Sequence, residues 1–254
     1  MRPLGSISFL LLLGAVRALS QTPVVSAGGV VNAAGFDAAV SPGSLVSIFG
    51  SNLAPQTLAA SVVPLPKSLA GVSVQFNGIG APLQFVSASQ INAQIPWEMG
   101  PGTYELQIQS IGLPNVTGTF TVSAIAPGLF QQPNAANLPL VFALHPNGSL
   151  ITIDSPAVQG EQVSIFGTGF GNYVRPAVDG FPASPVTEYA VAGTVTVNCG
   201  PATVTPDWAG AASGMVGVSL VQMTITKDMA GLGNASLTVA VNGKSSSTTI
   251  LPIQ

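Results

Sequence analysis

A twelve-residue stretch that occurs twice constrains this 254-residue chain more than any other feature. Residues 42–53 read PGSLVSIFGSNL and residues 159–170 read QGEQVSIFGTGF, so both contain the pentapeptide VSIFG. The matching glycines, Gly43 and Gly160, lie 117 positions apart. This period is too long for one unit of a solenoid and is typical of a whole domain. The repeat therefore predicts two copies of one fold, each with an early strand that ends in a glycine turn.

Apolar and polar residues alternate in both halves of the chain, as in the segment VSVQF at 72–76. Similar segments lie at 91–95, 104–108, 119–122, 194–198, 221–225 and 237–241, and apolar runs lie at 150–153, 163–166 and 250–253. Alternation lets one face of a strand be buried while the other meets water. The dipeptides Asn77-Gly78 and Asn242-Gly243 are typical of tight hairpin turns.

Helical patterns are scarce, because 29 glycines and 21 prolines interrupt every window before three helical turns are complete. Many short strands separated by turn residues indicate an all-β fold. The prediction is two tandem immunoglobulin-like antiparallel β-sandwiches, one at 21–125 and one at 141–254, joined by a linker at 126–140. The linker is placed where proline and polar residues follow the last strand of the first half.

The first twenty residues have the pattern of a secretory signal peptide. Arg2 precedes an apolar run from Ile7 to Val16, and Ala18-Leu19-Ser20 supplies small residues for cleavage before Gln21. The run is shorter than the roughly 20 apolar residues that a membrane-spanning helix needs. We expect a secreted protein, extracellular or at the cell surface, with no membrane span after cleavage; an uncleaved signal anchor is the alternative.

Charged residues are unusually few, at 6% of the chain against about 25% in ordinary soluble proteins. Without the signal peptide, four basic residues remain beside nine acidic ones, a net charge of −5. Such a chain cannot neutralise a phosphate backbone, and anionic membrane surfaces are disfavoured for the same reason. We therefore expect no nucleic-acid partner, and a surface of Ser, Thr, Asn, Gln and Gly that suits hydrogen-bonded extracellular contacts.

Short motifs lie at 32–36, 41–53, 65–66, 69–72, 77–78, 81–83, 89–92, 95–97 and 126–130, and the match then continues through the second repeat. Together they resemble a secreted domain family of acidobacteria (Solibacter-type), which often forms the C-terminus of larger extracellular proteins. Residues 42–53 also resemble the opening of IPT/TIG domains, which are immunoglobulin-like. The resemblance implies this fold and a secreted location, and it implies no catalytic residues. The second copy differs, because Leu220, Gln222 and Thr226 stand where the first copy has Gln90, Asn92 and Pro96.

Residues for catalysis or metal binding are sparse. His145 is the only histidine and lies in a turn, so we expect it at the surface; no Gly-x-Ser-x-Gly motif supports a Ser-His-Asp triad. Zinc needs several His or Cys ligands, and the chain has one of each. No EF-hand pattern occurs, which leaves open only a calcium ion at the domain junction. We expect no cofactor and no metal.

Cys199 is the only cysteine, so an intramolecular disulfide is excluded. It follows two alternating valines, which favours a buried small apolar side chain. A reactive or intermolecular thiol is the alternative.

Two tryptophans are the best candidates for a binding site. Trp97 and Trp208 both lie in segments expected to be loops, and sugar rings stack on exposed indoles while amides such as those of Gln90 and Asn92 bind hydroxyls. The alternative is that both tryptophans cap the open ends of their sandwiches. Specificity is expected where the two copies differ, at 89–102 and in a long irregular loop at 172–190.

These features predict a secreted, non-enzymatic binding or structural module for cell-surface or extracellular interaction, with protein or glycan partners. One alternative is a carbohydrate-binding module that acts through the loop tryptophans. The other is a glycoside hydrolase with an unrecognised carboxylate pair, which would need two acids about 5–10 Å apart across a cleft.

Overall fold

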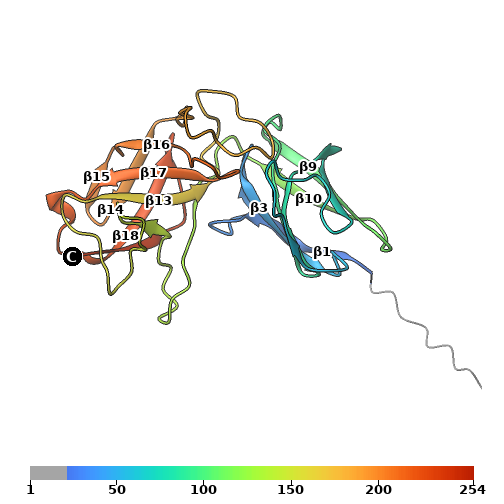
Figure 1. Ribbon diagram of the computed structural model, residues 1–254, viewed down its shortest axis with the longest axis horizontal. Helices are drawn as coiled ribbons and strands as arrows, with labels where there is room; N and C mark the ends of the chain where they lie inside the picture. The colour runs from blue at the N-terminus through green and yellow to red at the C-terminus, as the bar shows by residue number, and fades with distance from the viewer. Residues whose placement is uncertain (1–21) are drawn as a thin grey trace, which may run out of the picture.

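The computed structural model describes residues 22–254, which form two β-sandwiches lying side by side (Figure 1). The expected signal peptide and its cleavage site lie outside these residues. Each sandwich has its own core, with Ile48 and Phe76 fully buried in the first and Ile165 and Leu237 in the second. The fold is therefore all-β, as the alternating pattern predicts. No helix among residues 22–254 is long and apolar enough to cross a membrane.

The first sandwich packs a sheet of order β1-β3-β8-β7-β4 against a sheet of order β2-β10-β9-β5-β6. All its strand pairings are antiparallel except the short pair β2–β10. The strands are β1 (Val24–Asn32), β2 (Ala39–Val40), β3 (Leu45–Ser51), β4 (Leu58–Ala59), β5 (Val72–Phe76), β6 (Ile79–Gly80), β7 (Leu83–Val86), β8 (Gln90–Gln94), β9 (Gly102–Ser110) and β10 (Val116–Val122).

The second sandwich packs a sheet of order β11-β13-β17-β16, with β12 also on β13, against one of order β15-β14-β18-β19, with β20 also on β18. Its elements are β11 (Gly128–Leu129), β12 (Ala143–Leu144), β13 (Gln162–Thr168), β14 (Val195–Cys199), β15 (Ala202–Val204), β16 (Trp208–Ala211), β17 (Ser219–Thr224), the 3₁₀ helix η1 (Lys227–Met229), β18 (Gly233–Val241), β19 (Lys244–Ser245) and β20 (Thr249–Ile253).

The repeated pentapeptide forms β3 in one sandwich and β13 in the other, which confirms the predicted strands. The predicted glycine turn is wrong, because both strands continue through the glycine. A Cβ on Gly50 would lie 2.2 Å from the carbonyl oxygen of Val24, and one on Gly167 would lie 2.4 Å from that of Gly128. The shared glycine therefore lets a neighbouring strand approach closely.

Other local predictions have mixed outcomes. Both Asn-Gly dipeptides form hairpin turns with positive φ at each residue. Residues 150–153 form no strand, and only one isolated bridge joins Leu150 to Leu144. The segment 126–140, expected as a linker, contributes β11 to the second sandwich by pairing with β13. Its apolar Gly128 and Leu129 are buried there, so it is part of the fold rather than a tether.

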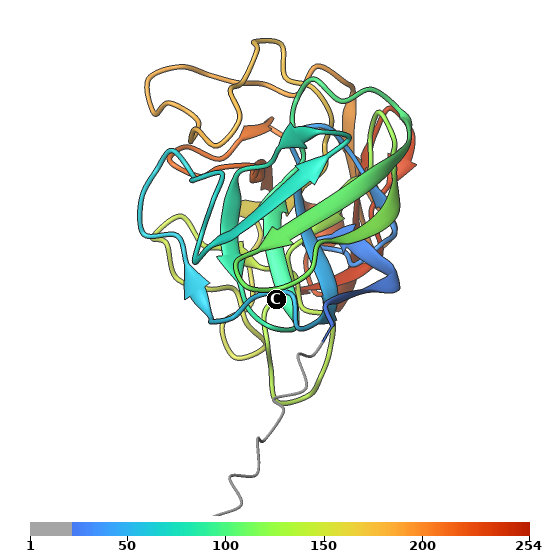
Figure 2. The same ribbon diagram turned by 90° about the vertical axis from the view of Figure 1, so that its right-hand side faces the viewer.

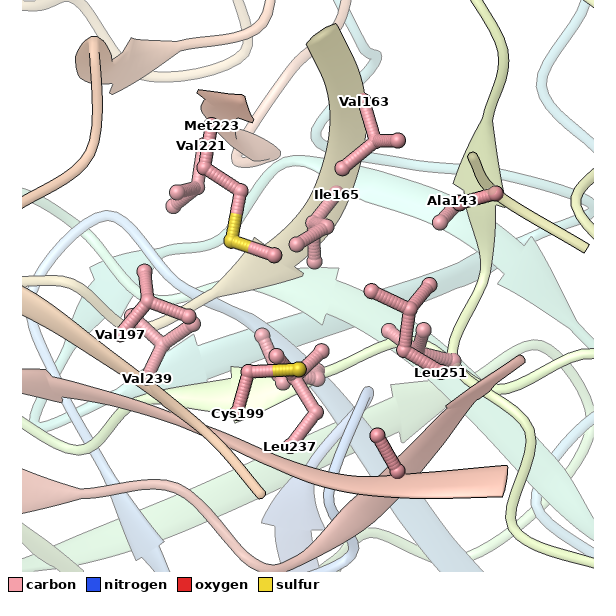
Figure 3. Packing of buried hydrophobic residues seen from close by; sticks show 14 of the residues in the cluster. Ala143, Val163, Ile165, Val197, Cys199, Val221, Met223, Leu237, Val239 and Leu251 are labelled. Atoms are coloured by element: carbon pink, nitrogen blue, oxygen red, sulfur yellow. The ribbon is translucent and has the colours of Figure 1, made fainter. Parts of the chain in front are cut away.

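Cys199 is fully buried in the second core, where its thiol lies among Leu237, Val239 and Met223 (Figure 3). Burial disfavours the thiolate and raises the pKa of Cys199 from its ordinary value of 9.0 to about 11. The interpretation as a buried apolar side chain is thus confirmed.

The raised pKa predicts a specific loss of stability in alkali. Below pH 9 the thiol is neutral in both states; between about pH 9 and 11 only the unfolded thiol ionises, so the free energy of unfolding falls. Two pKa units correspond to about 3 kcal/mol. Urea unfolding of wild type and Cys199→Val at pH 7.5, 9 and 10.5 measures the effect. Wild type should lose stability relative to the variant, and parallel curves would contradict the prediction.

The two sandwiches are joined by hydrogen bonds between residues far apart in sequence. The amide of Leu45 donates to Thr168 Oγ1 (2.9 Å), and Asn32 Nδ2 donates to the carbonyl of Ala126 (2.8 Å). On another side, residues 172–190, here called the crossing segment, leave the second sandwich and reach the first (Figure 1). There the amide of Leu65 donates a hydrogen bond to the carbonyl of Gly180 (2.8 Å). Figure 2 looks along the line joining the two sandwiches and shows the crossing segment as the orange loop at the upper edge.

Candidate binding groove at the domain junction

A row of aromatic rings runs from the first sandwich to the second, and its members Tyr173 and Tyr189 belong to the crossing segment. The ring centroids of Trp97 and Tyr173 are 5.2 Å apart, and those of Tyr173 and Tyr189 are 6.4 Å apart. Tyr189 and Trp208 then line the same hollow. The two tryptophans singled out from the sequence thus lie at opposite ends of one row.

Trp97 is fixed within the junction. Its backbone N–H donates to Asp179 Oδ1 of the crossing segment (3.0 Å). Gly43 lies against its indole so closely that a Cβ there would be 2.1 Å from Cζ2. Tyr173 packs on the ring as well, so Trp97 is half-buried, and its buried indole Nε1 has no partner among residues 22–254. This arrangement favours a structural role for Trp97 at the junction.

Trp208 is placed differently, because it begins strand β16 rather than lying in the expected loop. It pairs with Gln222 of β17 on the outer face of the sheet, opposite the core side that carries Val221. A Cβ on Gly210 would lie 2.4 Å from Cζ2 of Trp208, so the indole lies down against this glycine. The half-buried ring therefore forms a surface on the sheet.

Tyr189 links the two ends of the row. Its carbonyl accepts the amide of Ala211 (2.9 Å), and the amide of Val191 donates to Ala209 (3.0 Å), so the end of the crossing segment extends the sheet beside β16. Tyr173 is held by a contact of 3.2 Å between its hydroxyl and Ser219 Oγ. Burial raises the pKa of Tyr173, and the hydrogen bond to Ser219 lowers it in part.

Two adjoining hollows flank Tyr189. The first, of about 250 Å³, is mostly apolar and is lined by Gln94, Trp97, Tyr173, Ala177, Val178, Phe181, Pro182, Ala183, Ser184, Tyr189, Ala211, Met215, Gly217 and Val218. The second, of about 280 Å³, mixes aromatic and polar side chains and is lined by Ser184, Pro185, Thr187, Glu188, Tyr189, Trp208, Ala211, Ser213, Leu220 and Gln222. Ring faces beside hydroxyls and amides can hold a ligand that is both apolar and hydroxyl-rich.

The structure places Gln90 and Asn92 apart from both hollows. They lie on one face of β8, where Gln90 Nε2 donates to Asn92 Oδ1 (2.7 Å) and Ser47 Oγ donates to the same oxygen (3.1 Å). Gln94, two residues further on this face, is the one that lines the first hollow. Its side chain is used by the fold, because Nε2 donates to Gly43 and Oε1 accepts the amide of Gly180.

His145 lies in a turn and is half-buried rather than freely exposed. Its Nδ1 lies 2.6 Å from Glu161 Oε1 and its Nε2 lies 3.2 Å from Ser155 Oγ, the spacing of a hydrolase triad. The backbone around Ser155 does not, however, supply the amides that would stabilise an oxyanion. The N–H of Ser155 already donates to Thr152, and Pro156 has no N–H. The backbone at Ser155 and Pro156 therefore offers no free N–H to an oxyanion, and the cluster braces this loop.

Metal ligands do not converge in the described part of the chain. No group of three or more His, Cys, Asp or Glu side chains lies close enough there to hold an ion. At the junction, the Asp37 carboxylate accepts the hydroxyl of Ser247 (2.6 Å) and that of Asp179 accepts the Trp97 amide.

Sequence reasoning missed Tyr173, Phe181 and Tyr189, which build much of the groove. A signal existed, because aromatic residues make up only 6% of the chain and two of its three tyrosines lie within 172–190. A loop that concentrates rare aromatic residues is a stronger candidate for a binding surface than its irregularity alone suggests.

Comparisons with known proteins give no family: no family model and no curated protein matches the chain. Among solved structures, it is similar to a surface glycan-binding protein, SGBP-B, of Bacteroides ovatus in complex with a mixed-linkage heptasaccharide (15% identity, TM-score 0.38, 93% of this chain). The chain spans about half (47%) of that structure's length.

Two further structures are similar over 92% of this chain. They are the tandem Ig repeats of Dlar (12% identity, TM-score 0.20, 95% of that chain) and a membrane-anchored protein of Corynebacterium diphtheriae, described in its name as putative (15% identity, TM-score 0.23, 57% of that chain). With identities this low and TM-scores below 0.5, these likenesses add nothing about a ligand. The resemblance to the acidobacterial family stays a prediction.

Proposed function

We propose that this protein is a secreted binding module that holds a glycan at the cell surface or in the extracellular space, without turnover. The observation that carries this proposal is the second hollow, where Trp208 lies on the outer face of a sheet beside Gln222, Thr187 and Glu188. Sugars present an apolar ring face and a rim of hydroxyls. An indole surface and neighbouring hydrogen-bonding side chains are the two features that such a ligand needs.

The acids of the groove support binding rather than hydrolysis. Glu188 is the only carboxylate among the described side chains that line the two hollows. Glycoside hydrolysis commonly needs two carboxyl groups that flank the scissile bond. A single carboxylate can accept hydrogen bonds from sugar hydroxyls, but it leaves no second carboxyl group to complete the acid and base (or nucleophile) pair.

A protein partner is the second candidate, favoured by exposed apolar side chains on and beside the crossing segment. These are Val174, Val178, Phe181, Val186 and Met215. A cluster of this kind is typical of an interaction surface. Treating the partner extract with protease distinguishes the two candidates. A glycan ligand should still bind after the treatment, and a protein ligand should not.

Trp208→Ala is expected to weaken glycan binding by about thirtyfold, because tryptophans in binding sites commonly contribute about 2 kcal/mol or more. Depletion isotherms on insoluble cellulose, chitin, xylan and mannan measure the loss. Phe36→Ala removes an exposed aromatic ring of the first sandwich away from the groove and is the matched control. Retention of the Trp208 variant at the wild-type level, or no retention of wild type on any polymer, would contradict the proposal.

A further inference from the structure

We infer that the two hollows form one continuous groove for a linear, uncharged polysaccharide, with Tyr189 at the division between two subsites; this inference rests on the proposed function. The hollows share Ser184, Tyr189 and Ala211 as lining residues, so they meet along a common wall. The crossing segment borders both of them. An extended chain lying along this segment would contact each hollow in turn.

Size supports a ligand that spans both hollows. Small-molecule sites commonly enclose about 300–1,000 Å³. The hollows have volumes of about 250 Å³ and 280 Å³, so each alone falls below that range and the two together fall within it. A short saccharide would therefore fill one subsite and leave much of the available contact unused.

The two subsites differ in chemistry, and this sets what each contributes. The first is lined by Phe181, Val178 and Met215 together with aromatic rings, which suits the apolar faces of sugar rings. The second adds Gln222 and Thr187, which can form hydrogen bonds with hydroxyls. The polar subsite should hold a short saccharide by itself, and the apolar subsite should add affinity only once the chain reaches it.

Charge argues for an uncharged polymer. Within residues 22–254 no lysine or arginine lines either hollow, and Glu188 is present in the second. Uronic acid or sulfate groups would find no cation to pair with and would be repelled by this carboxylate. Binding of a neutral chain should also change little with salt, because no ion pair has to be screened.

The crossing segment, which borders the groove, is held in place by hydrogen bonds at its middle and at its C-terminal end. Gly180 bonds to the first sandwich through the Gln94 side chain (2.7 Å) and the Leu65 amide (2.8 Å). The C-terminal end pairs with β16 through Tyr189 and Val191. A preformed groove loses little conformational freedom on binding, which favours measurable affinity for long chains.

A length series tests the inference. Calorimetric titration of the full protein with neutral β-1,4-linked gluco-, xylo- and manno-oligosaccharides of two to eight units should show affinity rising at least tenfold and then levelling off. Phe181→Ala, which alters only the first subsite and an exposed ring, should weaken binding of long oligomers and spare short ones. Trp208→Ala should weaken both, and Phe36→Ala neither.

The outcomes separate the inference from the proposed function. If glycans bind but affinity does not depend on length, or Phe181→Ala leaves long oligomers unaffected, the continuous groove is wrong while the glycan-binding function stands. If carboxymethyl cellulose binds as well as hydroxyethyl cellulose, the preference for an uncharged chain is wrong. If no oligomer or polymer binds, the proposed function and the groove both fail.

Discussion

Gly43→Ala should destabilise the protein by about 3 kcal/mol or more, although it adds a single methyl group. Gly43 has a φ of +72°, a conformation that costs an alanine about 1–2 kcal/mol. The new Cβ would also lie 2.1 Å from Cζ2 of Trp97, and overpacking of this kind typically costs about 1–3 kcal/mol. Urea unfolding followed by tryptophan fluorescence measures the change.

Two other glycines separate these causes. Gly148 has a φ of +83° with open space around its Cα, so Gly148→Ala reports the backbone cost alone. Gly100 lies in the Trp97 loop with open space where a methyl group would be added and no positive φ, so Gly100→Ala should change stability little. If Gly43→Ala lowers the free energy of unfolding no more than Gly148→Ala does, the indole of Trp97 can shift to make room and is not held in the junction as described.

The strands and their class follow from local physics, which is why the sequence predicts them. Period-two alternation at 72–76 and 221–225 marks strands with one buried face, and the structure forms β5 and β17 there. The Asn-Gly turns are equally local, because they depend on two adjacent residues that tolerate positive φ. By contrast, the apolar run at 150–153 has no alternation, and its composition alone predicts a strand that the structure does not form.

The junction could not be predicted, because its contacts join residues with no shared local pattern. Leu45 and Thr168 are 123 positions apart, and Gln94 and Gly180 are 86 apart. The sequence predicts an irregular loop at 172–190, yet nothing in it states that this loop meets the first sandwich. The sequence therefore predicts only part of the candidate site. It points to both tryptophans, but it does not point to the tyrosines between them, because their position depends on how the two domains meet.

Thr168→Val should destabilise the protein by about 2–4 kcal/mol. Thr168 is fully buried, and its hydroxyl accepts the amide of Leu45 (2.9 Å) and donates to the carbonyl of Gly217 (2.6 Å). Valine has nearly the same shape but leaves both backbone groups without a partner, and each buried unpaired group costs about 1–3 kcal/mol. Urea unfolding gives the total, and hydrogen exchange at the Leu45 amide reports the lost contact directly.

Part of the effect should fall on the contact between the sandwiches, because Thr168 lies in β13 of the second sandwich and the amide of Leu45 lies in β3 of the first. Each sandwich has its own buried core, so a weakened junction should let the two unfold in separate steps. Thr168→Ser keeps the hydroxyl and should retain most of the stability, while Thr121→Val alters an exposed threonine and should change little. Unchanged exchange at Leu45 in the Thr168→Val protein would show that the hydroxyl does not bridge the domains.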